Sequence, residues 1–567
     1  MMPKGRTSGF WKGLFVASCL LQVPASLASA SPKLIVQVTV DQLRADLPNR
    51  YAHRFGKSGF NYFLQNGTVY LDAHHAHANT ETIVGHATLS TGAQPSVHGM
   101  VGNVWLDRKT GSTTYNVEDP DYALLSKNAD VNKDTEIDPT QKAAKTDGRS
   151  PRAILATTFG DELIAATNGK AKVFGVSIKD RGAVAMAGHG GKAFWFSKAI
   201  GEFVTSTYYY DAYPEWVIEW NARELPFQYA NTEWSLLNEQ STYLYGDSDD
   251  REWETNLPGF GRTFPHAYGD KDGKYFTTFL TTSPAGDELT LSFAKELIVN
   301  EALGKDDVTD FLSISFSSTD YVGHLFGPSS LEAEDNLLRL DQVLGDLITS
   351  IDEEVGLDNV LLVLSADHGG PDTPGYLKSK RIPAEYVDPD SWEKDEAIAR
   401  IKKQFKIKGD LIEKYSHPYV YITSSATQQS AVDQRSLEQA IASELQKFQG
   451  IRFAVSSRDL EENRVADGPV QRAVLNNFYA PRSGDVYVVF EPNWFINDFD
   501  GLEVAATHGS PWSYDSHVPL VFVGEGIRDQ RVTRTVYTVD VAKTLSALVG
   551  IKAPSGAFGE VLGEVFD

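Results

Sequence analysis

The chain has 567 residues, of which 41% are hydrophobic and 11% aromatic, and its 52 Lys and Arg against 76 Asp and Glu give a formal net charge of −24. This composition argues against an intrinsically disordered chain, and the acid excess argues against a protein that holds nucleic acid on a basic surface. The single cysteine, Cys19, allows no intramolecular disulfide and no cysteine-ligated metal site, so any metal ion here needs histidine and carboxylate ligands.

The first thirty residues have the pattern of a secretory signal peptide. A basic start precedes an apolar stretch over residues 13–23, and a small-x-small cleavage site follows. The basic residues are Lys4, Arg6 and Lys12, and the cleavage site is Ala28-Ser29-Ala30. We therefore expect cleavage after Ala30 and a periplasmic or secreted mature protein. A lipoprotein signal that ends at Cys19 is the second choice, because the apolar run before that cysteine is short.

Cleavage at that position would change two of the properties given above. It removes three cations and no acid, so the net charge of the mature chain becomes −27 instead of −24. It also removes Cys19, and the thiol-free chain that remains suits an oxidising compartment. No later stretch approaches the roughly eighteen consecutive apolar residues of a membrane span, so we expect no transmembrane segment in the mature chain.

Short apolar runs that stop at a polar residue recur along the rest of the chain. They cover residues 34–40, 173–178, 311–316, 360–364, 485–490 and 519–523. Near-continuous apolar runs are typical of strands that are buried on both faces of a sheet. Helical periods lie between them, the clearest after Ser330 and another over residues 537–549. The alternation predicts an α/β layered fold with its functional site at the carboxyl ends of the strands.

Two stretches interrupt this alternation. Residues of about 195–285 are rich in aromatic and polar side chains, and residues of about 375–480 mix charged helical segments with Pro and Gly. We expect both to be insertions in one catalytic domain of residues 31–567. The aromatic side chains could line a substrate cleft, but packing within a peripheral lobe is the preferred interpretation.

Thr82 stands near the start of a short predicted helix that Gly92 closes. A hydroxyl side chain at such a position is usually a helix cap. The N-terminus of a helix also favours an alkoxide and a bound phosphate, so Thr82 is a candidate nucleophile whose role depends on its neighbours.

Six residues of metal-ligating type accompany the strand pattern. Asp320 and His324 are four apart, so one turn of helix places both on the same face. The set is completed by Asp41 after the first strand, by the adjacent pair Asp367 and His368, and by His508. Each residue alone is a weak signal. Together, three carboxylates and three imidazoles form a ligand set for two zinc ions that needs no thiolate.

The order of these residues resembles that of the alkaline phosphatase superfamily. The motifs that carry the resemblance are Asp41, Thr82-x-x-Gly85-His86, Val101-Gly-Asn103, Lys179-Asp180-Arg181, Asp320-x-x-x-His324, Asp367-His368 and His508-Gly509. The chain looks most like the PafA-type, phosphate-irrepressible alkaline phosphatases and next like the nucleotide pyrophosphatase/phosphodiesterase branch. The Lys-x-Arg pair matches the PafA type and is lacking in the diesterase branch. The resemblance runs from about residue 33 to the carboxyl end.

The resemblance implies a phosphate monoester hydrolase on an alkaline-phosphatase-like three-layer sandwich, in which a central, mostly parallel sheet lies between helices and carries inserted lobes. It implies two zinc sites, one held by Asp320, His324 and His508 and the other by Asp41, Asp367, His368 and the Thr82 oxygen. Thr82 would attack phosphorus and form a phosphothreonine, which water hydrolyses to inorganic phosphate. Asn103, Lys179 and Arg181 would hold the non-bridging phosphate oxygens. A monomer is implied by the family alone.

General chemistry is consistent with these roles. Zinc lowers the pKa of a coordinated water from 15.7 to about 7 in the best case, which makes an oxygen nucleophile available near neutral pH. Lys179 and Arg181 alternate on what reads as an extended segment, so we expect both to point the same way and to offset the charge of a monoester dianion. Because the whole chain is acidic, we expect the metal cluster together with Lys179 and Arg181 to form a local cationic spot.

Two alternative functions remain open. The first is a phosphodiesterase or nucleotide pyrophosphatase on the same fold, whose substrate has one negative charge fewer for Lys179 and Arg181 to meet. The second is a non-catalytic phosphate-binding or surface protein that kept the fold, against which the complete set of metal ligands argues.

Several other histidines are not assigned to the site. His74, His75 and His77 alternate along an extended run, and we expect no metal role for them. His86 follows the nucleophile on its helix and is expected to be packed and hydrogen-bonded. We prefer His508 to His517 as the last ligand, because His517 leads into a strand.

Overall fold

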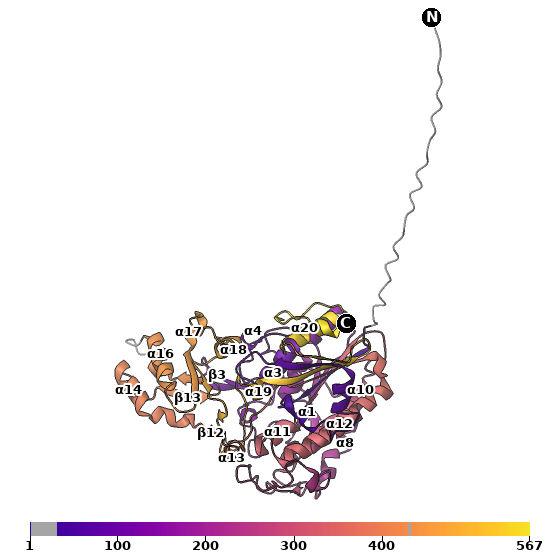
Figure 1. Cartoon of the computed structure of the whole chain (residues 1–567), viewed down its shortest axis with the longest axis horizontal. Coiled ribbons are helices and arrows are strands. Elements are labelled where there is room, and N and C mark those ends of the chain that lie inside the picture. Colours follow the sequence, from indigo (N-terminus) through magenta and orange to yellow (C-terminus); the bar gives the residue numbers. More distant parts are fainter. Residues whose placement is uncertain (2–30, 429–432, 567) are drawn as a thin grey trace. The chain divides into compact units, whose positions relative to one another are not determined.

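The computed structural model describes residue 1, residues 31–428 and residues 433–566 (Figure 1). Apart from residue 1, the predicted signal peptide lies outside the described residues, so its cleavage stays a prediction. Within the described ranges, every helix is too short or too polar to cross a membrane.

A ten-stranded sheet forms the centre of the described part of the chain, in the order β21-β2-β20-β11-β1-β10-β5-β6-β7 with β22 paired to β2. The strands are β1 (Leu34–Val40), β2 (Thr68–His74), β5 (Val173–Ser177), β6 (Lys192–Ser197), β7 (Glu202–Val204), β10 (Asp310–Phe316), β11 (Val360–Ser365), β20 (His517–Gly524), β21 (Gln530–Val532) and β22 (Val536–Tyr537). The five strands from β11 to β6 run parallel to one another. The mostly parallel sheet is therefore confirmed.

Four of the predicted apolar runs become the adjacent strands β11, β1, β10 and β5, and their residues are buried throughout. The two remaining runs lie elsewhere. Residues 519–523 belong to β20, which is antiparallel to β11. Residues 486–490 form β16, a strand of a different sheet. An apolar run predicts burial on both faces but does not identify the neighbouring strand, which depends on contacts made far away in the sequence.

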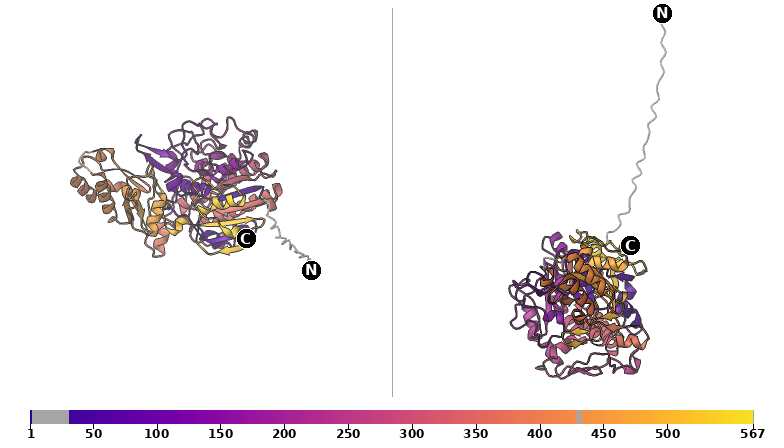
Figure 2. Two further views of the ribbon diagram at one scale, coloured as in Figure 1. Left: turned by 90° about the horizontal axis from the view of Figure 1, so that it is seen from above. Right: turned by 90° about the vertical axis from the view of Figure 1, so that its left-hand side faces the viewer.

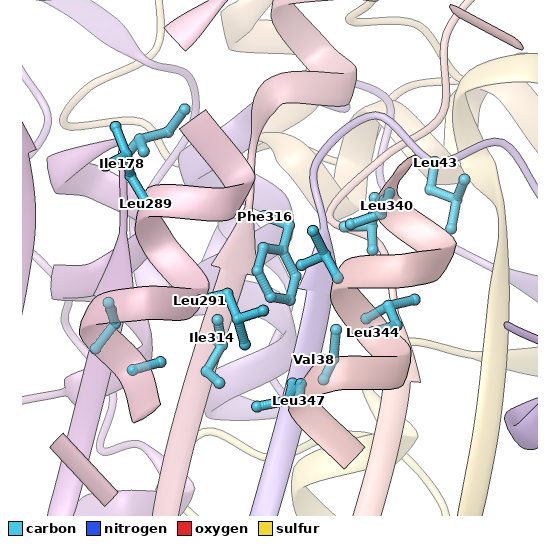
Figure 3. Close-up of a cluster of buried hydrophobic side chains, with 14 of the residues drawn as sticks. Val38, Leu43, Ile178, Leu289, Leu291, Ile314, Phe316, Leu340, Leu344 and Leu347 are labelled. Atoms are coloured by element: carbon cyan, nitrogen blue, oxygen red, sulfur yellow. The ribbon is translucent and has the colours of Figure 1, made fainter. Parts of the chain in front are cut away.

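Helices cover both faces of the central sheet, as the three-layer prediction requires. Alternate residues of β1 point to opposite faces: Val38 packs in one cluster with α10 (Pro284–Asn300) and α12 (Leu331–Glu354). Ile35 packs in another cluster with side chains of α6 (Phe159–Ala166) and α20 (Asp540–Leu548). Figure 3 shows the first face, where Val38 and Ile314 of the sheet lie beside Leu291 of α10 and Leu344 and Leu347 of α12.

A second sheet lies in the segment drawn in orange in Figures 1 and 2. Its order is β13-β14-β16-β15, formed by β13 (Ile412–Ser416), β14 (Tyr419–Ile422), β16 (Val486–Phe490) and β15 (Ile451–Ser456). The helices α14 (Glu396–Phe405) and α16 (Gln434–Leu445) contribute Ile398, Ile401, Leu437 and Ile441 to the same small core. The division into one catalytic domain with two insertions stays a prediction.

The aromatic stretch of residues 195–285 packs against the central domain. Trp220 and Trp234 are buried and belong to the main core cluster. Asp335 of α12 binds this stretch: it accepts hydrogen bonds from Trp234 Nε1 at 2.7 Å and from the backbone of Leu237 at 2.7 Å. A buried carboxylate is stable when several donors form hydrogen bonds with it, so Asp335 holds the aromatic stretch against α12. These contacts favour packing over a substrate cleft for the aromatic side chains.

Glu254 in this stretch is expected to give the chain a pH-dependent stability. Glu254, Glu332 and His266 are buried together, and His266 Nε2 lies 3.3 Å from Glu332 Oε1. Burial, together with the charge of Glu332, raises the pKa of Glu254 to about 10. The native chain thus keeps a proton that the unfolded chain releases near pH 4.5, so the free energy of unfolding falls as pH rises between these two values.

We expect Glu254→Gln to reduce this dependence, because glutamine keeps the shape and carries no charge at any pH. The melting temperature of the wild type should fall from pH 6 to pH 9, and that of Glu254→Gln should fall less. The exposed Glu525→Gln is the matched control and should follow the wild type. Parallel melting curves for Glu254→Gln and the wild type would show that Glu254 is ionised in the folded chain.

Candidate metal centre and active site

The predicted site residues lie at the carboxyl ends of neighbouring strands. Asp41 directly follows β1, and Lys179 follows β5 by two residues. Asp320 lies in the first turn of α11 (Ser318–Phe326), which follows β10. Asp367 and His368 follow β11. Because these four strands are adjacent and parallel, their ends bring together side chains that lie more than 300 residues apart.

Thr82 is the first residue of α3 (Thr82–Thr91), and Gly92 closes this helix with a φ of 64°. The predicted helix and its end are thus confirmed. Gly85 allows α3 to approach the end of β11, because a Cβ at this position would lie 1.9 Å from the carbonyl oxygen of Asp367. The absence of a side chain at Gly85 therefore brings the Thr82 turn next to the carboxylates.

Asp320, His324 and His508 form the first group of candidate metal ligands. His324 Nε2 lies 3.3 Å and His508 Nε2 lies 3.4 Å from Asp320 Oδ1. The other ring nitrogen of each histidine is held by a backbone carbonyl: His324 Nδ1 lies 2.8 Å from Ala506 O, and His508 Nδ1 lies 2.8 Å from Thr80 O.

His368 repeats this arrangement in the second group. Its Nδ1 lies 2.9 Å from Gly369 O, and its Nε2 lies 3.4 Å from both Asp41 Oδ1 and Asp367 Oδ2. A carbonyl oxygen only accepts hydrogen bonds, so the Nδ1 atom of each of the three histidines carries the proton. In a neutral imidazole with its proton on Nδ1, the Nε2 atom has a lone pair, and in these three histidines Nε2 faces a carboxylate oxygen. Two facing acceptors repel unless a cation lies between them, which is the usual environment of a metal-bound histidine.

Further atoms of this group lack a hydrogen-bonding partner in the described part of the chain. They are Asp41 Oδ1, Asp367 Oδ2 and His368 Nε2, all fully buried. A buried carboxylate oxygen without a donor is costly, so these atoms fit a divalent cation that the donor set would hold. Asp320 belongs to both groups, because Asp41, Asp320 and His368 also offer ligand atoms within 4.8 Å of one another.

Lys179 lies among the carboxylates and is fully buried. Its Nζ atom is 2.8 Å from Asp41 Oδ2 and donates a hydrogen bond to Asp320. Burial opposes its charge, but the two carboxylates outweigh burial and raise the pKa of Lys179 above its ordinary value. Burial and the neighbouring Asp367 raise the pKa of Asp41 well above its usual range. The carboxylates of the site outnumber Lys179 and Arg181, so the predicted cationic spot would require the metal ions.

Arg181 reaches the candidate nucleophile. Its Nη2 donates to Thr82 Oγ1 at 3.4 Å, and its Nη1 lies 2.8 Å from Asp138 Oδ2. The Asp138 pair fixes the guanidinium, so Arg181 has a defined position beside Thr82. Asn103 lies next to the same turn, where its Oδ1 accepts from the backbone of Ile83 at 3.1 Å.

The expectation of an extended segment for Lys179 and Arg181 is wrong. Lys179 is the N-cap residue of α7 (Asp180–Ala187), and Arg181 is in the first helical turn. The strand β5 ends at Ser177 and the helix starts almost at once, so alternation along a strand does not orient these side chains. Both still reach the site, Lys179 from the end of the strand and Arg181 from the helix start.

Sequence reasoning missed two residues that position the site. Gln42 Nε2 donates to Asp320 Oδ1 at 2.8 Å, and its backbone donates to Asp367 Oδ1 at 3.2 Å. Asp138 anchors Arg181 from a loop far from the other motifs. Gln42 follows a predicted ligand directly, which was a usable signal, whereas nothing near Asp138 in the sequence marks it.

The unassigned histidines are placed as follows. His86 is buried and bonded to Thr82 O at 2.8 Å and to Ser315 Oγ at 2.9 Å, which agrees with a packed residue. His74 and His517 lie opposite each other on β2 and β20, so His508 is the histidine that the structure brings to Asp320. The rings of His74 and His517 are stacked, with an angle of 17° between their planes, and with Asp72 they form a separate group whose ligand atoms lie within 4.8 Å of one another.

The fold and the site together define an α/β scaffold with groups of candidate metal ligands beside a buried threonine hydroxyl. The chain belongs to the type I phosphodiesterase / nucleotide pyrophosphatase family, whose model matches residues 35–511. It is 34% identical over 558 residues to alkaline phosphatase PafA of Elizabethkingia meningoseptica, covering 98% of each chain. It is 33% identical over 539 residues to alkaline phosphatase PhoV of Synechococcus elongatus, covering 94% of this chain and 93% of that protein.

A solved structure agrees with these relatives. The crystal structure of wild-type alkaline phosphatase PafA matches 95% of this chain and 99% of its own with a TM-score of 0.85 at 34% identity. The predicted resemblance to PafA-type enzymes and the predicted fold class are therefore confirmed. The relatives also support the prediction of an enzyme of the phosphoric monoester hydrolase class.

Proposed function

We propose that the chain is a phosphate monoester hydrolase that uses two zinc ions and a phosphothreonine at Thr82 to release inorganic phosphate. One observation supports this most directly: three imidazoles are held through Nδ1 by backbone carbonyls, with Nε2 facing buried carboxylates. The names of the relatives, which are alkaline phosphatases, agree with the reaction.

The donor set fits two divalent cations. Asp320, His324 and His508 would hold one, and Asp41, Asp367, His368 and the Thr82 oxygen would hold the other. When bound, such ions lower the pKa of coordinated oxygens and neutralise charge on the attacking and leaving oxygens of an in-line displacement. Without them, a phosphate dianion would meet three buried carboxylates. Nitrogen and oxygen donors without sulfur agree with zinc.

The side chains of the protein supply the nucleophile and the contacts to the phosphate oxygens. Thr82 supplies the hydroxyl oxygen that attacks phosphorus, and its place at the first turn of α3 adds the favourable end of a helix dipole. Arg181 and Asn103 would hold the non-bridging oxygens, a role supported by their contacts with the Thr82 turn. The alcohol leaves, the phosphothreonine is hydrolysed by water, and Thr82 recovers its proton with the release of phosphate.

Arg181 and Lys179 favour a monoester over a diester, because a monoester dianion has one more negative charge for them to meet. The diesterase alternative remains the second candidate, since the matching family model describes diesterases. We also propose that the protein acts as a monomer outside the cytoplasm after cleavage near Ala30.

The test compares p-nitrophenyl phosphate with bis-p-nitrophenyl phosphate in the wild type and in Arg181→Ala. We expect the wild type to favour the monoester, and Arg181→Ala to lose roughly 10²-fold in kcat/KM for the monoester, the scale of one lost transition-state contact. The loss for the diester should be smaller. The exposed Arg528→Ala is the control and should match the wild type. Faster turnover of the diester by the wild type would favour the diesterase alternative.

A further inference from the structure

A cavity of about 140 Å³ opens beside the candidate metal centre. At its polar end it touches Asn103, Arg181, Asp320, His324 and His508, and Thr82, Asp41, Asp367 and His368 do not line it. The cavity therefore lies on the His324 and His508 side of the site. An in-line displacement places the leaving oxygen across phosphorus from the attacking oxygen, so a substrate attacked by Thr82 would direct its leaving group toward this cavity.

One wall of the cavity is apolar and comes from a single stretch of chain. Its side chains are Phe490, Phe495, Ile496, Phe499, Leu502 and Val504. Phe499 and Leu502 belong to the short hairpin of β18 (Asp498–Phe499) and β19 (Leu502–Glu503). An apolar wall makes few favourable contacts with a small hydrophilic alcohol. A flat apolar leaving group that packs against the wall removes apolar surface from water, which favours binding.

The wall has a fixed position relative to the metal ligands. The backbone N–H groups of Ala505 and Ala506, which follow the hairpin, donate to His324 O at 2.9 and 3.2 Å. The ring of Phe499 lies edge to face with the ring of His324 at 5.1 Å between centroids. A group bound against Phe499 would thus have a defined distance from the leaving oxygen, which is the requirement for a specificity pocket.

The charge around the cavity selects against a second anion. Besides Asp320, the lining contains the acids Glu81, Asp138 and Asp498, and Arg181 is its single Lys or Arg among the described residues. Arg181 is already paired with Asp138. A leaving group that carries its own phosphate or carboxylate would be repelled here.

We propose that this cavity is a leaving-group pocket that selects uncharged alcohols with an aromatic or similarly flat apolar face, and that Phe499 is its main specificity-determining residue. The proposal rests on the proposed phosphatase function and adds the class of substrate. The cavity volume agrees with a ring of this size, since an apolar cavity of roughly 150 Å³ holds benzene.

The experiment compares benzyl phosphate with ethyl phosphate, whose leaving alcohols have similar acidity, in the zinc-loaded wild type and in Phe499→Ala. Benzylphosphonate and ethylphosphonate, which are not hydrolysed, report binding alone. We expect the wild type to favour benzyl phosphate, and Phe499→Ala to lose about tenfold in kcat/KM for benzyl phosphate while ethyl phosphate changes little. Leu502→Ala tests the same wall if Phe499→Ala does not fold. Phe558→Ala, whose side chain is 76% exposed, is the matched control.

The outcomes separate the two proposals. Equal losses for both esters in Phe499→Ala, or no loss for either, would overturn the leaving-group pocket while leaving the phosphatase intact. If the wild type hydrolyses neither ester, the phosphatase proposal fails, and the phosphonates then decide the pocket. Tighter binding of benzylphosphonate than of ethylphosphonate, lost in Phe499→Ala, supports the proposed pocket. Equal binding of the two phosphonates to the wild type overturns it. Unchanged zinc content in the variant shows that His324 is not disturbed.

Discussion

Thr82→Ala is expected to lower kcat for a phosphate monoester by at least about 10³-fold, the scale seen when a nucleophile is removed from an enzyme that works through a covalent intermediate. Thr82 is buried at the start of α3, and the side chain of Arg181 contacts its hydroxyl. The remaining groups can still bind and polarise the ester, so a small residual rate is expected. Steady-state hydrolysis of p-nitrophenyl phosphate measures the loss.

Thr82→Ser is the matched variant, because it keeps the hydroxyl and removes one methyl group. It should retain most of the activity that Thr82→Ala loses. Both variants should melt near the wild-type temperature, which separates a lost nucleophile from a lost fold. Undiminished turnover by Thr82→Ala would remove Thr82 from the mechanism.

Removal of divalent metal ions should have an effect of similar size and should also destabilise the fold. The three carboxylates of the site are at most 2% exposed, and Asp41 Oδ1 and Asp367 Oδ2 have no hydrogen-bonding partner among the described residues. A cation that binds only the folded chain stabilises it, so its loss should lower the melting temperature. Activity should fall to background after treatment with a chelator and return with added zinc.

Asp320→Ala tests the same prediction through the carboxylate that both ligand groups share. We expect it to lose metal content, measured by elemental analysis, together with activity. Glu525→Gln, which changes an exposed acid, should retain both. Full activity in wild-type protein shown to be free of metal would contradict the proposed role of the cluster.

The sequence predicted those parts of the site that depend on local spacing. The apolar run of β1 ends at Asp41, and the four-residue spacing of Asp320 and His324 places both on one face of α11. The helix of Thr82 ends at Gly92 as predicted. These features need only a strand period, a helical turn and a C-cap, which are properties of neighbouring residues.

The parts that were missed depend on tertiary contacts. Asp138 anchors Arg181 from a loop, and its role appears only when α7 starts directly after β5. The apolar run of residues 486–490 is buried in the second sheet, because strand pairing is decided by distant neighbours. Phe499 lies in a short hairpin with no sequence motif, and only the fold places it beside His324.

The net charge of the chain can be compared with the charges found in the site. The sequence predicts that the metal cluster with Lys179 and Arg181 forms a cationic spot in a chain of net charge −24, and the site contains three buried carboxylates beside these two cations. In the proposed function, the attraction for a phosphate dianion would depend on the divalent cations that the carboxylates would hold. This explains why acids dominate a site proposed for an anionic substrate.

The stereochemical course at phosphorus tests the central claim most directly. Each in-line displacement inverts the configuration at phosphorus. Transfer to Thr82 followed by transfer to water therefore predicts net retention with a monoester made chiral by oxygen isotopes. Net inversion would show that water attacks the ester directly, and it would contradict a phosphothreonine intermediate at Thr82.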